Sequence, residues 1–218
     1  MYLKLAIALI PIAIILLVSE YLWRKKIIRG ERARKFIHIL AGIHMAFWPH
    51  YIPFDGIFIL GCLALTVLIY SRYTKMFHAM YAVKRITYGE IFYAGAIAFC
   101  AYYAQEPWIF TISILLMALA DGGAAVVGRF WGRNNEYLVF GQTNLRKSIA
   151  GTAAYVLLAY VSIFSGWLVG GEEVIRENYL LALGLLPLGS AILENFSPYG
   201  LDNFFTPAFA TLLLNSLL

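Results

Sequence analysis

Asp121 is the ionisable residue whose surroundings in the sequence most require an explanation. It follows the apolar run 112–120 and precedes two glycines and two alanines. A carboxylate inside a membrane span costs roughly 2.5–3.5 kcal/mol on insertion scales, so a retained acid needs a partner or a task. The small residues Ala124, Gly128 and Gly132 recur every four positions and share one helix face. The spacing therefore allows two interpretations, a tight helix-packing seam with Asp121 as a hydrogen-bonding residue, or a functional carboxylate beside a ligand.

Oxygen ligands are concentrated in a second segment, near the C-terminus. Between Glu194 and Asn203 the chain carries two carboxylates, Glu194 and Asp202, together with the side-chain amide of Asn203. Hard cations such as Mg²⁺ bind carboxylate and carbonyl oxygens of proteins and phosphate oxygens of substrates. This short segment is therefore a candidate for a divalent-cation site.

A polar and basic segment, 141–148, precedes an apolar helix that we expect to begin at Ile149. Its candidate phosphate-binding residues, together with the first turn of the helix, are Arg146, Lys147, Ser148, Gly151 and Thr152. Free N–H groups and the positive dipole end at a helix N-terminus bind anions. The segment is not a Walker A loop, because Arg146 stands where the second glycine would be. A phosphate site and a cytoplasmic basic cluster with a serine cap both remain open.

Lys35 and His38 lie three residues apart at the start of an expected helix, where their side chains share a face. Considered alone, Lys35 is explained as one of the basic residues that flank a membrane span, and His38 as a buried histidine that forms a hydrogen bond. Glu90 opens the fourth expected span, where the helix dipole stabilises a carboxylate. Together these residues predict a cytoplasm-facing membrane site with acids for a divalent cation and bases for phosphates, the parts that phosphoryl transfer requires.

The composition predicts that transmembrane helices position these residues. The chain is 61% hydrophobic and 13% charged, against about 45–50% and about 25% in soluble domains. We expect an all-α, polytopic integral membrane protein with a single transmembrane domain over residues 1–218, holding about 7–8 transmembrane helices at roughly 20 apolar residues each. The expected spans are 3–23, 35–53, 56–71, 89–105, 107–128, 148–169, 179–196 and 201–217. Pro187, Pro198 and Pro207 interrupt the last two, as membrane helices tolerate.

The basic residues predict the orientation of these spans. Of the 17 Lys and Arg residues, all except Lys4 and Arg176 fall in three alternate loop regions, 24–35, 72–88 and 129–147. Loops rich in Lys and Arg lie on the cytoplasmic side. Eight spans therefore place both termini on the outer side and the candidate site on the cytoplasmic side. The net charge of +5 thus comes from basic residues that lie next to membrane spans. This position argues for membrane lipids, and against nucleic acid, as the partner of the positive charge.

The ordered set of motifs resembles the CTP-dependent lipid-alcohol kinases, a family that includes dolichol kinase, phytol kinase and CTP-dependent diacylglycerol kinase. The matching pieces run in family order from residue 34 to 207: Arg34-Lys35-x-x-His38, Gly89-Glu90, Asp121-x-x-Ala124-x-x-x-Gly128-x-x-x-Gly132, Lys147-Ser148-x-x-Gly151-Thr152, and Glu194 followed by Asp202-Asn203 and Pro207. Each motif is weak alone, and their order makes the set specific. The short single domain is more similar to phytol kinases than to long dolichol kinases.

The resemblance implies transfer of the γ-phosphate of CTP to the hydroxyl of a membrane-embedded long-chain alcohol of the polyprenol, dolichol or phytol type. It implies a Mg²⁺ ion on the nucleotide phosphates, held by Asp121, Glu194 and Asp202. Asn203 is expected to help these carboxylates, and phosphate binding is assigned to Lys147 and to Lys35, Arg129, Arg133, Arg146, Ser148, Gly151 and Thr152. His38 or Glu90 is the expected acceptor of the alcohol's proton. These roles require Asp121 and Lys147 to converge around a metal-bound triphosphate at the inner leaflet.

Two other functions remain open. The related CTP:phospholipid cytidylyltransferases share the aspartate-glycine and lysine-serine regions, but Asp202-Asn203 replaces their C-terminal Lys-Asp, His-Gly-Gly and Asp-Arg signature. A membrane transporter or channel with an anion-binding inner vestibule would use similar charges, although acids are absent deep in the outer half of the spans. The acceptor also remains open among phytol, farnesol-like alcohols, dolichol, undecaprenol and diacylglycerol, because apolar surface recognises a tail with little sequence code.

Overall fold

The computed structural model describes most of the 218-residue chain as a bundle of helices. The described residues are 2–74, 76, 78–81, 87–139, 146–170 and 179–217. Several residues used in the sequence analysis lie outside them: 141–145 of the basic segment, Lys75, Lys84, Arg85 and Arg176.

Helices occupy every segment in which the hydropathy predicts a span, which confirms the all-α fold. The long helices are α1 (Tyr2–Arg24), α2 (Glu31–Ala46), α3 (Phe54–Thr74), α5 (Gly89–Tyr103), α6 (Pro107–Leu115), α7 (Asp121–Trp131), α8 (Ile149–Gly170), α9 (Tyr179–Phe196) and α10 (Asp202–Ser216), with two short helices, η1 (Trp48–His50) and α4 (His78–Tyr81). Within the described ranges, four apolar helices are long enough to cross a membrane: α1, α3, the continuous helix Pro107–Trp131 and α8. These helices indicate a membrane protein.

Proline does not break the last two helices, contrary to the expectation from the sequence. Pro187 lies inside α9 and Pro207 lies inside α10, and both helices continue through them. Only Pro198 lies in the turn between the two helices. A proline removes one backbone hydrogen bond, and packed neighbours in a membrane protein accommodate that loss. The turn consequently places Glu194 near the end of one helix and Asp202 at the start of the next.

A two-stranded antiparallel hairpin, which the sequence did not predict, follows α7. Its strands are β1 (Glu136–Leu138) and β2 (Arg146–Ser148). Strands of three residues are too short to show a period-two pattern among polar neighbours. Tyr137 lies opposite Lys147 in the register, and its hydroxyl is 2.6 Å from Thr152 Oγ1 and donates to Asn195 Oδ1 at 2.7 Å. These contacts fix the hairpin, and with it Lys147, against α8 and α9.

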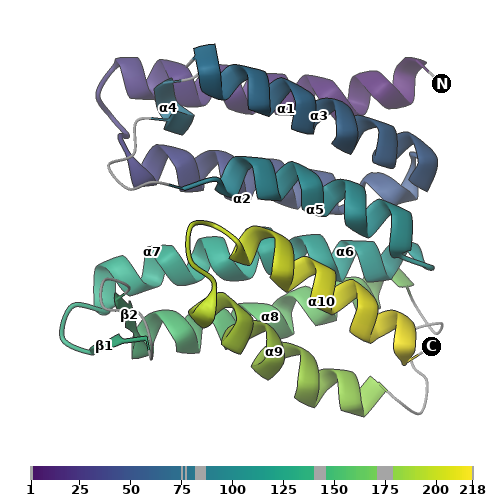
Figure 1. The fold of residues 1–218 in the computed structure, drawn as a ribbon. Helices are drawn as coiled ribbons and strands as arrows, with labels where there is room; N and C mark the ends of the chain where they lie inside the picture. Colours follow the sequence, from purple (N-terminus) through teal and green to yellow (C-terminus); the bar gives the residue numbers. More distant parts are fainter. Residues whose placement is uncertain are drawn as a thin grey trace.

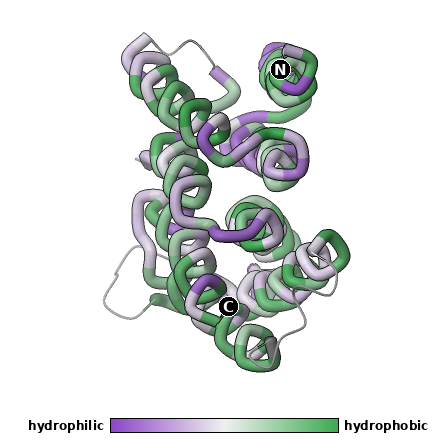
Figure 2. Tube along the Cα trace, turned by 90° about the vertical axis from the view of Figure 1, so that its right-hand side faces the viewer, coloured by the Kyte–Doolittle hydropathy of each residue, from purple (hydrophilic) through white to green (hydrophobic). Residues whose placement is uncertain are grey.

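The helices lie side by side along a common direction (Figure 1), and a view along them shows hydrophobic residues on most turns (Figure 2). The helix Pro107–Trp131 is central, because α2, α8 and α10 all pack against α6. Its residues Ile109, Phe110 and Ile112 are fully buried. Both ends of the chain lie at the end of the bundle opposite the β1–β2 hairpin (Figure 1).

The small residues of α7 pack tightly against the start of α8, as the packing interpretation of their spacing predicts. A Cβ on Gly128 would lie 3.0 Å from Ser148 Oγ, and one on Gly132 would lie 2.4 Å from the same atom. A Cβ on Gly151 would lie 3.2 Å from the Ala124 carbonyl oxygen. Larger side chains would therefore displace α8 in a closely packed interior.

Candidate active site

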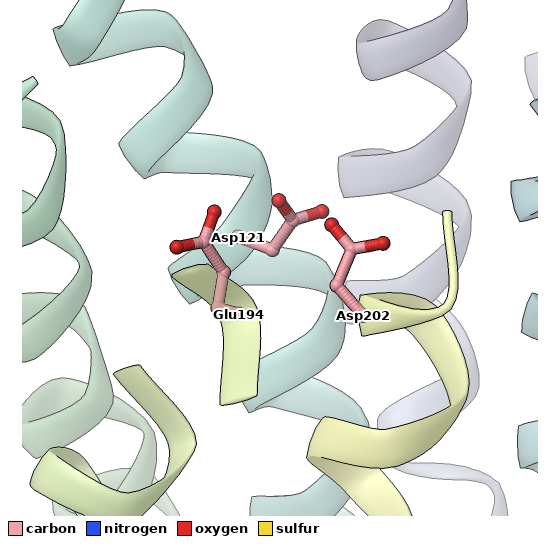
Figure 3. Close-up of side chains that lie close together, drawn as sticks. All are labelled: Asp121, Glu194 and Asp202. Atoms are coloured by element: carbon pink, nitrogen blue, oxygen red, sulfur yellow. The ribbon is translucent and has the colours of Figure 1, made fainter. Parts of the chain in front are cut away.

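Three carboxylates from three helices meet inside the bundle (Figure 3). Asp121 begins α7, Glu194 lies in the last turn of α9, and Asp202 begins α10. One oxygen of each carboxylate lies within 4.8 Å of the other two. Asp121 and Glu194 are buried, and Asp202 is half-buried. Oxygens on opposite sides of one bound cation are about 4.2 Å apart for Mg²⁺ and up to about 5.2 Å apart for Ca²⁺, so this set of hard, anionic ligands fits a divalent cation.

A π-helical turn precedes Asp121 and ties it to α2. The turn, η2, covers Leu116–Ala120 between α6 and α7. The Asp121 N–H bonds the carbonyls three and five residues before it, and so skips the Met117 carbonyl that an α-helix would use. The Met117 carbonyl instead accepts a hydrogen bond from His38 Nε2 at 2.8 Å. Such π turns are frequent at functional sites, and this one sets the backbone from which Asp121 projects.

Two of the carboxylates are paired with lysines from other segments. Lys35 Nζ lies 2.5 Å from Asp121 Oδ2, and His38 Nε2 lies 3.3 Å from the same oxygen. Lys147 Nζ forms an ion pair with the Glu194 carboxylate and donates to the Glu194 carbonyl at 3.2 Å. Ionised carboxylates in close proximity repel one another. The two lysines offset that repulsion and hold two of the acids in fixed orientations.

Lys147 stays charged in this environment. Burial acts to lower the pKa of its ammonium group, but the charge of the Glu194 carboxylate and its hydrogen bond outweigh burial and raise that pKa above the ordinary value. The carboxylates of Asp202 and Asp121 act in the same direction. A permanently cationic group that faces a cavity is suited to charge-assisted hydrogen bonds with phosphate oxygens.

The turn between α9 and α10 is held against the start of α5. Asn203 Nδ2 donates to the Gly89 carbonyl at 2.8 Å. Gly200 has a φ of 89°, and a Cβ there would lie 2.6 Å from Gly89 Cα. Glycine is the residue that adopts positive φ and allows such an approach without a steric cost. These contacts fix the start of α10, and therefore Asp202, relative to the rest of the site.

The carboxylates and lysines line one cavity of ≈ 800 Å³, a volume typical of small-molecule sites. Most site residues expected from the sequence line it: Asp121, Glu194, Asp202, Lys35, Lys147, Arg129, Arg146, Ser148, Gly151, Thr152 and Asn203. Asp121 and Lys147 thus converge on one space, although they come from separate segments. His38, Glu90 and Arg133 are not among the residues that line the cavity.

The two expected proton acceptors make other contacts. A carbonyl oxygen only accepts hydrogen bonds, so the His38 Nε2 atom that binds the Met117 carbonyl carries a proton and is not a base. Glu90 forms an ion pair with Arg72 of α3, away from the cavity. Arg133 is exposed beyond the end of α7. His38, Glu90 and Arg133 are therefore not assigned a direct contact with a ligand in the cavity.

The N-terminus of α8 is not a free anion-binding site, contrary to one expectation from the sequence. Ser148 Oγ accepts the Gly151 N–H at 3.1 Å. The backbone carbonyl of Asn135 accepts the Ile149 N–H at 3.1 Å, and its side-chain oxygen accepts the Ala150 N–H at 3.4 Å. Ser148 is therefore a helix cap, and the neighbouring N–H groups already have partners.

Arg29 and Arg34 also belong to the site, although the sequence patterns did not predict them as members. Both line the cavity, and Arg34 is buried and forms an ion pair with Glu31. In the sequence they belong to a basic cluster over residues 24–35, and their type alone does not distinguish them from topological charge. The position of Arg34 directly before Lys35 in the family motif was the available signal.

A curated relative matches the chain over almost all of its length. The phytol kinase of Synechocystis sp. (strain ATCC 27184 / PCC 6803 / Kazusa) is 31% identical over 214 residues, which cover 95% of this chain and 88% of the relative. The chain belongs to the phytol kinase family of lipid-alcohol kinases. The family assignment agrees with the order of motifs in the sequence, and the cavity is the candidate active site of this lipid-alcohol kinase family member. No family profile and no solved structure matches the chain.

Proposed function

We propose that this chain transfers the γ-phosphate of CTP to the hydroxyl of a membrane-embedded long-chain alcohol of the phytol or polyprenol type. One observation carries the proposal: Asp121, Glu194 and Asp202 meet beside Lys35 and Lys147 in a single cavity. Phosphoryl transfer requires carboxylates for a metal ion, fixed positive charge around the phosphates, and a positioned nucleophile. The 31% identity to a phytol kinase supports an alcohol as the acceptor.

Asp121, Glu194 and Asp202 are the residues that would hold Mg²⁺. The ion, when bound, supplies positive charge to the β- and γ-phosphate oxygens. The chain's own contribution is to place three oxygen ligands before the nucleotide arrives. Lys35 and His38 both contact Oδ2 of Asp121, which fixes the orientation of that carboxylate, and Lys147 does the same for Glu194.

Basic side chains around the carboxylates would bind the nucleotide phosphates. Lys35 and Lys147 lie beside the carboxylates, whereas the side chains of Arg129 and Arg146 are exposed where the cavity meets solvent. A nucleotide that arrives from water would meet the two arginines first, and arginine matches phosphate geometry with two parallel hydrogen bonds. The lysines would then stabilise the charge that develops on the transferred group.

In the proposed reaction the alcohol oxygen forms a bond to the γ-phosphorus. The bond between that phosphorus and the oxygen bridging it to the β-phosphate breaks, and the O–H bond of the alcohol breaks as its proton is released to water, so the products are CDP, an alkyl phosphate and a proton. The transition state is loose in most analyses, and the protein contributes position and charge rather than covalent chemistry. The fixed carboxylates and lysines of this cavity are suited to that task.

The proposal includes eight spans, both termini outside, and an active site that faces the cytoplasm. The cavity is lined by basic residues of the 24–35 and 129–147 regions, and such residues gather on the cytoplasmic side. Both chain ends lie at the opposite end of the bundle (Figure 1). A site at this boundary reaches the nucleotide in water and the alcohol in lipid. Fusion reporters at the two termini test the arrangement, and a cytoplasmic signal from either terminus contradicts it.

Turnover by the purified protein tests the reaction. The protein in nanodiscs is offered phytol, farnesol, a polyprenol and diacylglycerol, each with CTP, ATP, GTP or UTP. We expect an alkyl phosphate and CDP from CTP with one class of alcohol, and turnover about 10²–10³-fold slower in the Asp121→Asn variant. A CDP-lipid with release of pyrophosphate would assign a cytidylyltransferase instead. Absence of any nucleotide turnover, with substrate flux in liposomes, would assign a transporter.

A further inference from the structure

Three hydroxyl groups meet in the interior between α8, α9 and α10. Tyr155, Ser190 and Thr206 are each at most 1% exposed, and the Tyr155 hydroxyl lies near the side-chain hydroxyls of the other two. Among the described residues, neither Tyr155 Oη nor Thr206 Oγ1 has a hydrogen-bond partner of ordinary geometry. Buried polar groups nearly always have such partners. This hydroxyl cluster (Tyr155, Ser190 and Thr206) therefore has unused hydrogen-bonding capacity.

The hydroxyl cluster lies next to the three carboxylates, on the side away from the β1–β2 hairpin. Ser190 precedes Glu194 by one turn of α9, and Thr206 follows Asp202 by one turn of α10. Four residues of α-helix rise about 6 Å, so both hydroxyls lie deeper in the bundle than the acids. Tyr155 is close enough to Glu194 to interact with its charge. The cluster is thus a neutral polar layer between the acids and the apolar core.

We propose that the hydroxyl cluster binds the hydroxyl group of the lipid alcohol, an inference that rests on the proposed kinase function. The cluster carries no positive charge, which a phosphate buried at this depth would need as compensation. Its hydroxyls both donate and accept hydrogen bonds, which matches an O–H group. The exposed cations Arg129 and Arg146 lie on the solvent side of the carboxylates. The two substrates therefore approach the carboxylates from opposite sides, the nucleotide from water and the alcohol from the membrane.

Helix α9 provides the route from lipid to the hydroxyl cluster. It packs against α8 and α10 and leaves an apolar outer face uncovered, with Leu181, Leu185, Leu188 and Ile192 exposed. Pro187 of α9 and Pro207 of α10 lie at the depth of the cluster, and each removes a backbone hydrogen bond from its helix. At the depth of the cluster, α9 and α10 therefore each have one backbone hydrogen bond fewer than an uninterrupted helix. The alcohol's tail stays in lipid beside α9, while its hydroxyl group enters between α9 and α10.

Substitutions that remove one hydroxyl with little change in volume test the site. In Tyr155→Phe and in Thr206→Val we expect the KM for the alcohol to rise about tenfold, the loss of one hydrogen bond of about 1.4 kcal/mol, while the KM for the nucleotide stays unchanged. The matched control is Ser162→Ala, which removes a fully buried α8 hydroxyl that donates to the Leu158 carbonyl at 2.9 Å. This control changes neither KM.

Equilibrium binding of radiolabelled phytol without nucleotide separates this site from the kinase proposal. Wild-type protein that binds phytol, with about tenfold weaker binding by Thr206→Val, supports the site whether or not phosphate is transferred. Equal phytol binding by the wild type and both variants overturns the proposed site. In that case a buried water, and not the alcohol, would be the hydrogen-bond partner of the hydroxyl cluster. Equal rises in both KM values also overturn it. If Tyr155→Phe does not fold, Thr206→Val carries the test.

Discussion

Lys35 and Asp121, 86 residues apart in the sequence, form a buried ion pair with 2.5 Å between Nζ and Oδ2. Their side chains are 9% and 7% exposed, so solvent hardly screens the pair. Removing one partner of a buried pair leaves an uncompensated charge and costs about 3–5 kcal/mol. The pair therefore connects α2 to α7 at the carboxylates, and any test of function at either residue needs a parallel measurement of stability.

Asp121→Asn is expected to lower kcat by about 10²–10³-fold, the loss typical when an electrostatic contribution to the transition state is removed, because Asp121 would hold the metal ion. Asparagine keeps the shape of the side chain and an oxygen that accepts a hydrogen bond from Lys35. Extraction in detergent and the melting profile should confirm a folded protein. Asp55→Asn, at an exposed position in the first turn of α3, is the matched control and should keep full activity. Near-wild-type turnover by Asp121→Asn would remove Asp121 from the mechanism.

Lys147→Ala is expected to raise the KM for the nucleotide at least about tenfold, because a charge-assisted hydrogen bond contributes about 1.5–3 kcal/mol. The KM for the alcohol should change little, since Lys147 enters the cavity from β2 rather than from the hydroxyl cluster. Initial rates at varied CTP and fixed alcohol give the measurement. Lys4→Ala, on the exposed start of α1, provides the control. Unchanged nucleotide affinity contradicts the role.

Much of the fold was predictable because a helix in lipid needs apolar residues along its whole length. The hydropathy consequently located α1, α3 and α8 to within a few residues at either end. The β1–β2 hairpin left no such pattern in three-residue strands. The π turn at Leu116–Ala120 was also invisible, since its residues are apolar like those of α6 before it.

The sequence made most residues of the candidate site predictable, but it did not indicate which of them form ion pairs with one another. Ionisable residues stand out in an apolar sequence because each is costly there, which singled out Asp121, Glu90 and Lys147. Their pairing depends on how helices pack, and no local spacing encodes that. Glu90 therefore entered the predicted site although it pairs with Arg72, and Arg34 was missed although it lines the cavity.

His38 is expected to act as a positioning residue for Asp121. His38→Ala should lower kcat by about 10–100-fold, as the loss of an outer-shell partner does, with the KM for the nucleotide unchanged. His38→Gln should recover part of the loss, because its amide can donate to the Met117 carbonyl. The pH dependence of kcat distinguishes a positioning residue from a general base. A limb of the profile that disappears in His38→Gln would identify a general base instead.

Gly200→Ala is expected to lower the free energy of unfolding by about 1–3 kcal/mol, because alanine is strained at positive φ and its Cβ would press on the backbone. The φ of Gly200 is 89°, and the contact is 2.6 Å from Gly89 Cα. Gly184→Ala on α9 is the matched control, since nothing lies within 4 Å of a Cβ there. Melting in detergent measures both. Equal melting temperatures of the two variants would show that the turn tolerates a side chain.

The ion pair of Lys147 predicts a specific dependence of stability on pH. Burial lowers the pKa of Lys147, but Glu194 raises it by more, so the folded state holds this proton more tightly than the unfolded chain. The stabilisation is then fully present below the unfolded pKa of about 10.4 and is lost as the pH rises through the raised folded value. The melting temperatures of wild type and Lys147→Met should differ by a constant amount from pH 8 to about pH 10, and the difference should shrink above that. A difference that already shrinks between pH 8 and pH 9 would mean that burial, rather than Glu194, dominates the titration of Lys147.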